Sequence, residues 1–543
     1  MRVRLAIVAL PLILSAAAWA VVFAAFPPRN HRFPLIDEWA FAREALDFAR
    51  GGGIHYDGWA SMPQLGQWLW SVPFVAAFGA NLFALRLSTI VLGWLGLVAF
   101  YDLLRQLNVA AWQAAFATAA FALNPLFFLA QGTYMTDVPA VSFALMALCL
   151  YGRAFQRHDP RLLAPAAIVA VLGAMTREHA IAAPLTAGIV LAGTRELRRR
   201  AGWVISVLAP VMVGAATHFW FMSRPDIQPM PPEVPDLFRL AFTPWFIIHT
   251  LGLAALPVLL LDPWPRSWPR FGIALAATLG IAYFWYKHGD LFAFDGLFPY
   301  TIGLIDPHGV YSMNIVVGAT ARDAMLSLKA EALLTLAGCV GAAALIDRLP
   351  TRLRGGNLLL IFGLFQTIPL FVTRALYDRY LIFLIPSGLY VVLTDQSEVV
   401  SRAWRRIRAE AALALFALAS VGLMHDWLAW NTARWNVGRR AIERGIDPWD
   451  IEGGFEWNGW YGPKPVPKRK PKAKPDGEAI MLRYTAEQFY YVRGRYALSF
   501  SVLKRTVPLD AEPFHLWMKR GTRQIFLVKR LAPERMLVRA QSP

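Results

Sequence analysis

Long apolar runs recur along this chain and are separated by short polar segments. Several runs are about 15 to 22 residues long, and about 20 apolar residues cross the hydrocarbon core of a bilayer as a helix. Of the 543 residues, 57% are hydrophobic and only 17% are charged, which is too apolar for an ordinary soluble domain. The sequence therefore predicts an all-α polytopic membrane protein.

These runs predict about thirteen membrane-spanning helices. The first run, Leu5 to Phe26, resembles a signal peptide, but its length suits a bilayer span, so we expect a retained helix. Residues 37–50 have the periodicity of a surface helix. The run from Leu65 to Ala80 is short and contains Pro73, so we expect it to be interfacial or re-entrant. The remaining expected spans are 83–104, 109–130, 134–152, 162–176, 180–194, 202–222, 244–261, 271–286, 328–346, 357–373, 380–395 and 410–430.

Basic residues gather in every second loop, and this pattern predicts the orientation. Arginines are frequent, for example, in segments 195–200 and 402–408. Because basic loops stay in the cytoplasm, we expect a cytoplasmic N-terminus and an extracytoplasmic C-terminus. The same loops account for the net charge of +18 without nucleic-acid binding. The expected outward-facing segments are 27–64, 131–136, 177–179, 223–243, 287–327, 373–379 and the chain after residue 430.

The chain after the last span has a different composition. We expect residues 1–430 to form the transmembrane domain and residues 431–475 to form an extracytoplasmic segment that ends in a linker rich in Lys and Pro. Residues 476–543 contain two strand-like stretches, 496–503 and 524–528. They predict a small extracytoplasmic α/β domain.

Charged side chains at a bilayer edge are costly unless they are paired or solvated, so clusters of them are candidate functional sites. Such residues occur in most of the segments expected to face outward. They are Asp37, Glu38, His55, Asp57, Asp137, Arg177, Glu178, Lys287, Arg374, Asp378, Arg379 and Tyr380.

Each cluster also has a structural interpretation, and both interpretations stay open at this point. Asp37 and Asp137 each precede a helix and could only cap it. Arg177 and Glu178 could pair with each other and turn the chain. Lys287 could belong to a solvated loop, and Arg379 with Tyr380 could anchor a helix at the interface. Three histidines, His55, His179 and His288, suggest a divalent metal, but no close ligand spacing supports it, so we expect neither metal nor cofactor.

Several of these motifs, in this order along the chain, resemble the GT-C glycosyltransferases. The nearest branch includes the protein O-mannosyltransferases and the lipid A aminoarabinose transferases. The resemblance covers residues 1–195 and returns at 374–395. It is carried by the Asp37-Glu38 pair, Pro63-Gln64-Leu65-Gly66, Arg86-Leu87-Ser88, Met135-Thr136-Asp137-Val138-Pro139 and Asp378-Arg379-Tyr380-Leu381. The chain departs from the aminoarabinose-type pattern at Ser61-Met62-Pro63, where a Lys before paired prolines is missing.

The resemblance implies transfer of a sugar from a polyprenyl-phosphate donor to a lipid, glycan or protein hydroxyl, usually with inversion, on the outer face of a bacterial inner membrane. It implies that Asp37 is the general base and that Glu38 and Asp137 support the site. Arg379, with Arg374, Arg177 or Lys287, would hold the donor phosphate. The residue types suit this chemistry, because a carboxylate can take the hydroxyl proton and cations can hold the leaving phosphate.

A transporter or flippase of a lipid-linked saccharide is the alternative, since it would also need cations that face phosphate groups. Such proteins have polar groups near mid-membrane and often internal repeats. The polar clusters here lie toward one face, and the chain has no convincing repeat. The sequence therefore favours the enzyme.

Overall fold

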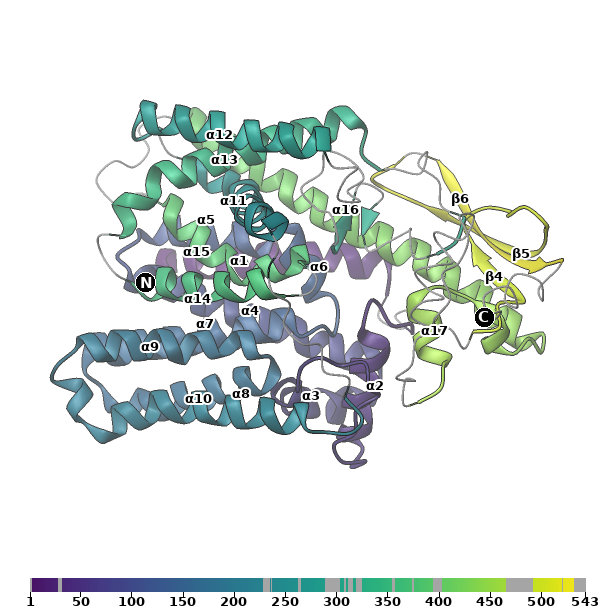
Figure 1. Ribbon diagram of the computed structural model, residues 1–543, viewed down its shortest axis with the longest axis horizontal. Coiled ribbons are helices and arrows are strands. Elements are labelled where there is room, and N and C mark those ends of the chain that lie inside the picture. Colours follow the sequence, from purple (N-terminus) through teal and green to yellow (C-terminus); the bar gives the residue numbers. More distant parts are fainter. Residues whose placement is uncertain are drawn as a thin grey trace.

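The computed structural model is mostly helical, with a small sheet near the C-terminus (Figure 1). Everything below refers to the residues that it describes. These are 2–27, 32–227, 235, 237–261, 265–288, 303–306, 309–310, 316–318, 325–353, 357–373, 376–393, 403–464, 492–519 and 521–531.

Seventeen α-helices lie within the described residues, together with short 3-10 turns. The first ten are α1 (Arg2–Ala25), α2 (Glu38–Ala49), α3 (Leu65–Phe78), α4 (Leu82–Gln106), α5 (Ala111–Ala122), α6 (Pro125–Gln131), α7 (Asp137–Arg157), α8 (Leu163–Thr176), α9 (Ala182–Gly193) and α10 (Ala201–Met222). The others are α11 (Leu237–Leu259), α12 (Trp268–His288), α13 (Leu328–Leu353), α14 (Leu358–Val372), α15 (Ile385–Val392), α16 (Ala403–Glu443) and α17 (Phe455–Tyr461).

Six described helices are long and apolar enough to cross a membrane, or seven if one bent pair counts as a single span. The bent pair is α5 and α6, which meet at 63° within the expected span 109–130. The side chain of Asn124 caps α6 and Pro125 occupies its first turn, a combination that starts a new helix. Shorter apolar helices include α3, α8, α9 and α14. The expected number of about thirteen spans is therefore not confirmed.

Two other expected spans differ from the structure in length. The expected span 380–395 is a 3-10 turn, η8 (Asp378–Phe383), followed by the short helix α15. The expected span 410–430 belongs to the 41-residue helix α16, which continues to Glu443. The chain does turn at Arg177, as expected, since α8 ends at Thr176 and a 3-10 turn, η3 (Glu178–Ile181), leads into α9.

A four-stranded sheet packs against α16 near the C-terminus. Its strands are β3 (Ile451–Glu452), β4 (Tyr496–Ser499), β5 (Thr506–His515) and β6 (Thr522–Arg530), in the order β3-β4-β6-β5, and only β3 and β4 are parallel. The sequence analysis missed β5, which contains Pro508 and Pro513; as an edge strand it tolerates both. Apart from Pro463 and Lys464, the expected linker lies outside the described residues, as do residues 476–491 of the expected α/β domain.

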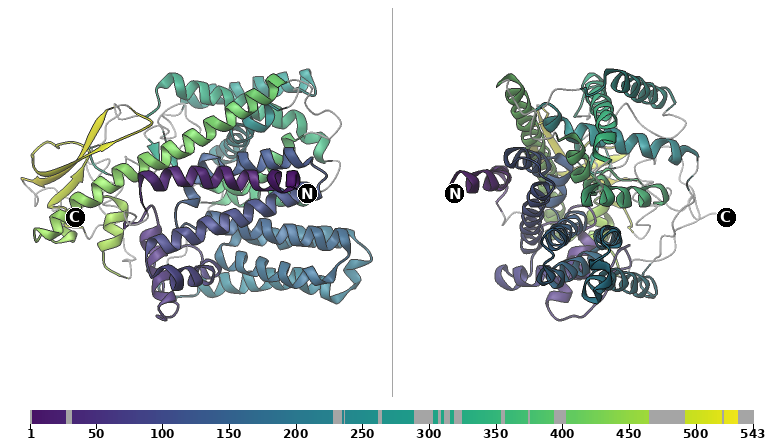
Figure 2. Two further views of the ribbon diagram at one scale, coloured as in Figure 1. Left: turned by 180° about the vertical axis from the view of Figure 1, so that it is seen from behind. Right: turned by 90° about the vertical axis from the view of Figure 1, so that its left-hand side faces the viewer.

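Most of the long helices run roughly along the long axis of the molecule, so that many loops lie at its two ends (Figures 1 and 2). The N-terminus lies at the same end as the basic loop between α9 and α10. Helices α2 and α17 and the C-terminal sheet lie at the other end. The turn that carries Asp37 therefore lies at this second end, because it leads directly into α2.

Candidate active site

The turn before α2 has a strained backbone. Ile36 has a φ of 51°, in the left-handed region that β-branched residues rarely adopt. The next residue, Asp37, is the N-cap of α2, but its side chain accepts no hydrogen bond from the backbone N–H groups of the first turn of that helix. The interpretation of Asp37 as a cap alone therefore does not fit, because its carboxylate is turned to other partners.

The Asp37 carboxylate contacts one neutral donor and one cation. The indole Nε1 of Trp59 donates to Oδ1 at 2.8 Å, and Nη2 of Arg379 lies 3.4 Å from Oδ2. The Asp37 side chain keeps 13% of its surface exposed. Asp37 is thus oriented by Trp59 and lightly paired with Arg379, and its side chain is not fully enclosed.

Arg379 also lies near a second carboxylate, that of Asp137. Its Nε is 3.9 Å from Asp137 Oδ2, and Arg177 Nη1 donates to Asp137 Oδ1 at 2.7 Å. The Asp137 side chain is fully buried, and its Oδ2 accepts no hydrogen bond from the described residues. Arg177 pairs with Asp137 rather than with the adjacent Glu178. Two carboxylates and two guanidinium groups from four distant segments therefore share one cluster.

Tyrosine rings support the two arginines. The guanidinium carbon of Arg177 lies 4.8 Å from the ring centre of Tyr380, and that of Arg379 lies 4.8 Å from the ring of Tyr377 and 5.9 Å from that of Tyr380. Rings at these distances attract cations and restrict their orientation. Tyr377 and the 3-10 turn that follows it therefore supply both a cation, Arg379, and the aromatic rings that lie against the two arginines.

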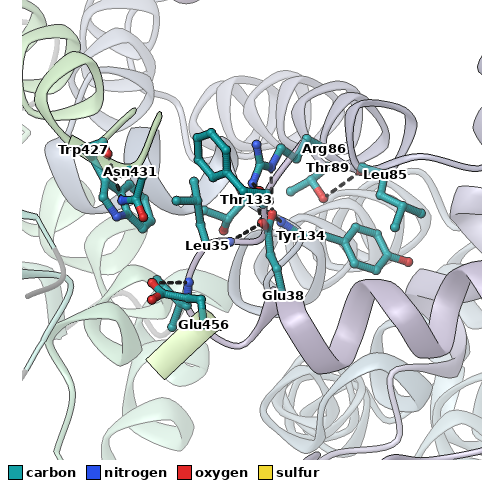
Figure 3. A network of polar contacts seen from close by, with 12 residues as sticks. Leu35, Glu38, Leu85, Arg86, Thr89, Thr133, Tyr134, Trp427, Asn431 and Glu456 are labelled. Carbon is teal, nitrogen blue, oxygen red and sulfur yellow. Dashed lines mark hydrogen bonds and ion pairs between the residues drawn. The ribbon is translucent and has the colours of Figure 1, made fainter. Parts of the chain in front are cut away.

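Glu38, the neighbour of Asp37, lies in a different environment (Figure 3). Its buried carboxylate accepts hydrogen bonds from the backbone N–H groups of Leu35 and Tyr134, at 2.7 and 2.5 Å. Arg86 completes the set with two more, at 2.9 and 2.5 Å. These donors enclose Glu38, which fastens the turn to α4 and to the segment before α7.

A second acidic cluster lies further along α2. Arg43 pairs with Asp57 at 2.6 Å, and Glu44 accepts hydrogen bonds from the Asp57 backbone N–H and from Gln64. Burial raises the pKa of Glu44 well above its usual value, and the nearby Asp57 adds to this shift. Burial also raises the pKa of Asp57, against the effect of Arg43. Asp57 therefore holds the loop after α2 rather than joining the Asp37 cluster.

The other predicted site residues have varied positions. His55 is exposed, and Lys287 is exposed at the end of α12 beside Tyr283 and Tyr286. Glu178 is half-buried next to Arg177. Asp378 accepts hydrogen bonds from the backbone of Leu304 and Ile305, and burial raises its pKa to about 6 against these donors. Arg374 lies outside the described residues.

Sequence reasoning missed four residues that shape the site: Trp59, Arg43, Glu456 and Arg434. Arg86 was noticed only as part of a motif. An arginine in the first turn of an apolar helix is itself a signal, because it needs a buried partner. The others gave no such signal, since their partners are known only from the tertiary structure.

Among the described residues, no group of three or more His, Cys, Asp and Glu side chains is placed to hold a metal ion. The positive charge next to Asp37 and Asp137 comes from Arg379 and Arg177.

Residues 61–220 match the family model of the dolichyl-phosphate-mannose-protein mannosyltransferases. This segment contains Asp137 and Arg177 but neither Asp37 nor Arg379. The match confirms the resemblance to the GT-C glycosyltransferases that the motifs indicate. Together with the apolar helices, it supports an integral membrane protein. A search of curated proteins finds no match.

Two solved structures that this chain matches are distant from it in sequence. ArnT from Cupriavidus metallidurans bound to undecaprenyl phosphate is 14% identical, with a TM-score of 0.43 over 95% of this chain and 97% of that chain. The Archaeoglobus fulgidus oligosaccharyltransferase tethered with an acceptor peptide is 14% identical, with a TM-score of 0.37 over 86% of this chain and 61% of that chain.

Proposed function

We propose that this protein is a membrane glycosyltransferase. It transfers a sugar from a polyprenyl-phosphate donor to an acceptor hydroxyl at the outer face of a bacterial inner membrane. One observation carries the proposal: the lightly paired carboxylate of Asp37 lies 3.4 Å from the guanidinium group of Arg379, with Arg177 on the other side of Asp137. A base and a phosphate clamp thus lie next to each other.

The proposed reaction is a single displacement with inversion. The acceptor hydroxyl gives its proton to the Asp37 carboxylate and its oxygen bonds to the anomeric carbon. The bond from that carbon to the phosphate oxygen breaks, and its electron pair leaves with the polyprenyl phosphate. Arg379 and Arg177 stabilise the charge of the leaving phosphate through charge-assisted hydrogen bonds. Glu38 is enclosed by its own donors, so Asp37 acts as the base.

Two further observations support a lipid-linked donor. The four residues lie at helix ends rather than in the middle of long helices: Asp37 before α2, Asp137 at the start of α7, Arg177 after α8 and Arg379 in η8. This position suits a donor whose phosphate lies at the membrane surface while its chain stays in the bilayer. In addition, the description of the family that matches residues 61–220 names dolichyl-phosphate-mannose, a lipid-linked sugar of this kind.

The proposal can be tested by mass spectrometry of the lipids that copurify with two variants. Asp37→Asn should retain a polyprenyl-phosphate sugar, because the donor binds but is not consumed. Arg379→Ala should lose most of it, because a charge-assisted contact to the phosphate contributes about 1.5–3 kcal/mol.

A matched control is Arg224→Ala. Arg224 also pairs with an aspartate, Asp226, and lies against the aromatic rings of Tyr56 and Trp220, but it forms no ion pair with Asp37 or Asp137. The control should retain the lipid. Equal retention by Arg379→Ala and the wild type would contradict the clamp, and movement of labelled lipid across vesicles without sugar transfer would contradict the enzyme.

A further inference from the structure

The segment after α16 touches the strained turn that carries Asp37. Glu456, in the first turn of α17, accepts a hydrogen bond from the backbone N–H of Ile36 at 3.3 Å (Figure 3). Ile36 is the residue with the positive φ, and Asp37 follows it directly. The contact joins residues 420 positions apart in the sequence.

Glu456 is itself held in place by a buried ion pair. Its other carboxylate oxygen lies 2.9 Å from Arg434 Nη2, and neither side chain has more than 1% of its surface exposed. Arg434 also donates to Asn431 Oδ1 at 2.6 Å and stacks on Trp430. Because Arg434 holds one oxygen of the Glu456 carboxylate, the other oxygen is fixed in a position where it can accept the Ile36 N–H.

The backbone before α17 is built to bring Glu456 to this point. Gly454 has a φ of 90°, which residues with a side chain rarely adopt. At Gly453, an added Cβ would lie 2.2 Å from the Trp457 ring. Both glycines therefore allow the chain to turn sharply from β3 into α17.

Two more contacts join α17 to the surroundings of Asp37. The ring of Phe455 lies 5.4 Å from that of Trp59, whose indole donates to Asp37. Arg43 of α2 donates to the carbonyl oxygens of Gly459 and Trp460 at 3.1 and 2.7 Å. Helix α17 thus contacts the turn, the Asp37 donor and α2 itself.

We propose that α17 is a positioning element of the active site and that Glu456, held by Arg434, keeps Asp37 in its reactive orientation through the Ile36 backbone. The turn is fastened from two sides: Glu38 accepts the N–H of Leu35, and Glu456 accepts the N–H of Ile36. The two consecutive N–H groups therefore each donate to a carboxylate that is fixed in place. These hydrogen bonds stabilise the positive φ of Ile36, which an isoleucine rarely adopts without such support. This inference rests on the proposed function, in which Asp37 is the base.

The test compares two double variants that both lack the buried ion pair. Arg434→Met with Glu456→Met removes both charges and the acceptor, whereas Arg434→Met with Glu456→Gln removes the charges and keeps an acceptor oxygen at residue 456. Apolar replacement of both members of a buried pair is often tolerated, so the Met/Met protein should fold, and the Met/Gln protein likewise has no unpaired charge. The two proteins differ only at residue 456, where Gln keeps an acceptor oxygen for the Ile36 N–H.

Two measurements are expected to separate these variants. Hydrogen exchange of the Ile36 amide should be faster in the Met/Met variant and close to wild type in the Met/Gln variant, because exchange follows local opening. The kcat of sugar transfer should fall about tenfold to a hundredfold in Met/Met only, as for a catalytic group misplaced by about 1 Å. The donor KM should stay within about twofold, since Arg379 and Arg177 are unchanged.

Glu452→Gln is a control in the same segment, because Glu452 accepts hydrogen bonds from Gly454 and Asn458 within that segment. It should leave exchange at Ile36 unchanged. Equal exchange at Ile36 in the two double variants, or faster exchange with an unchanged kcat, would overturn the inference. A folded wild-type protein that transfers no sugar would instead overturn the proposed function, and the exchange result does not depend on that outcome.

Discussion

Asp37 and Glu38 are adjacent acidic residues with opposite environments. Glu38 is fully buried and accepts hydrogen bonds from two backbone amides and from Arg86. Asp37 retains 13% exposure, one indole donor and one cation at 3.4 Å. One carboxylate is fully engaged in holding the turn, and the other is free to exchange partners. The difference indicates a division of roles, in which Glu38 fixes the backbone that presents Asp37.

The same contrast holds for the cations. Arg86 and Arg434 are buried against single carboxylates at 2.5 and 2.9 Å, whereas Arg379 lies between Asp37 and Asp137 at 3.4 and 3.9 Å. An arginine held this loosely can turn to a phosphate at a lower cost than an arginine in a tight pair. We therefore assign Arg86 and Arg434 to structure and Arg379 to the proposed binding site.

The largest expected effect is on stability, from Glu38→Gln. This change leaves the buried Arg86 without its charged partner, and breaking a buried pair in this way lowers the free energy of unfolding by about 3–5 kcal/mol. Asp37→Asn should lower it by only about 1 kcal/mol, because Asn can still accept the hydrogen bond from Trp59 and only the 3.4 Å contact with Arg379 is weakened. Denaturation in detergent micelles would measure both. Equal losses in the two variants would remove the contrast between the neighbours.

The next effect is on donor affinity, from Arg379→Lys in an Asp37→Asn background that cannot consume the donor. Lysine keeps the charge but loses the planar fork that binds a phosphate with two hydrogen bonds. The Kd for a polyprenyl-phosphate sugar should rise about tenfold to a hundredfold, the equivalent of about 1.5–3 kcal/mol. Arg224→Lys in the same background is the control. An unchanged Kd would assign Arg379 to structure alone.

A smaller effect is expected where ion pairs are partly exposed. Arg440 of α16 pairs with Asp510 of β5 at 2.9 Å, with 35% of the arginine side chain exposed. Arg440→Ala should lower the free energy of unfolding by at most about 1 kcal/mol, because solvent screens such pairs. The same denaturation assay applies. A loss as large as that of Glu38→Gln would mean that burial does not set the strength of the pairs here.

The smallest effects are expected at two residues that the sequence nominated and the structure leaves exposed. His55→Ala and Lys287→Ala should each change the free energy of unfolding by less than about 0.5 kcal/mol. They should also leave the donor Kd within about twofold of wild type. A tenfold rise in Kd would require the loss of about 1.4 kcal/mol of binding free energy, and we expect neither side chain to contact the donor. Lipid titration would check this. A tenfold loss at Lys287 would extend the clamp to α12.

The sequence predicted the structure well where the pattern of residues within one segment determines that segment's structure. Apolar runs predicted the helical architecture, the charged break at Arg177 predicted the turn between α8 and α9, and acidic and basic residues beside apolar runs nominated Asp37, Asp137, Arg177 and Arg379. These four meet in the structure. Their catalytic roles stay predictions.

The sequence was uninformative where the answer depends on a distant partner. Asp37 and Glu38 share residue class and position, and only the donors from α4 and from residue 134 separate them. Glu456 gave no signal because its partner, Ile36, is apolar and lies 420 residues away. The two prolines of edge strand β5 argued against a strand there. The full length of α16 was missed because polar residues follow the apolar part that predicted the span 410–430.

The measurement that tests the division of roles most directly is single-turnover sugar transfer by Asp37→Asn, with retained donor lipid and unfolding temperature measured on the same sample. We predict a loss of about 10²- to 10⁴-fold in rate, as for removal of a general base, with donor retention and unfolding temperature like those of the wild type. Transfer at the wild-type rate by the folded, donor-bound variant would contradict the account.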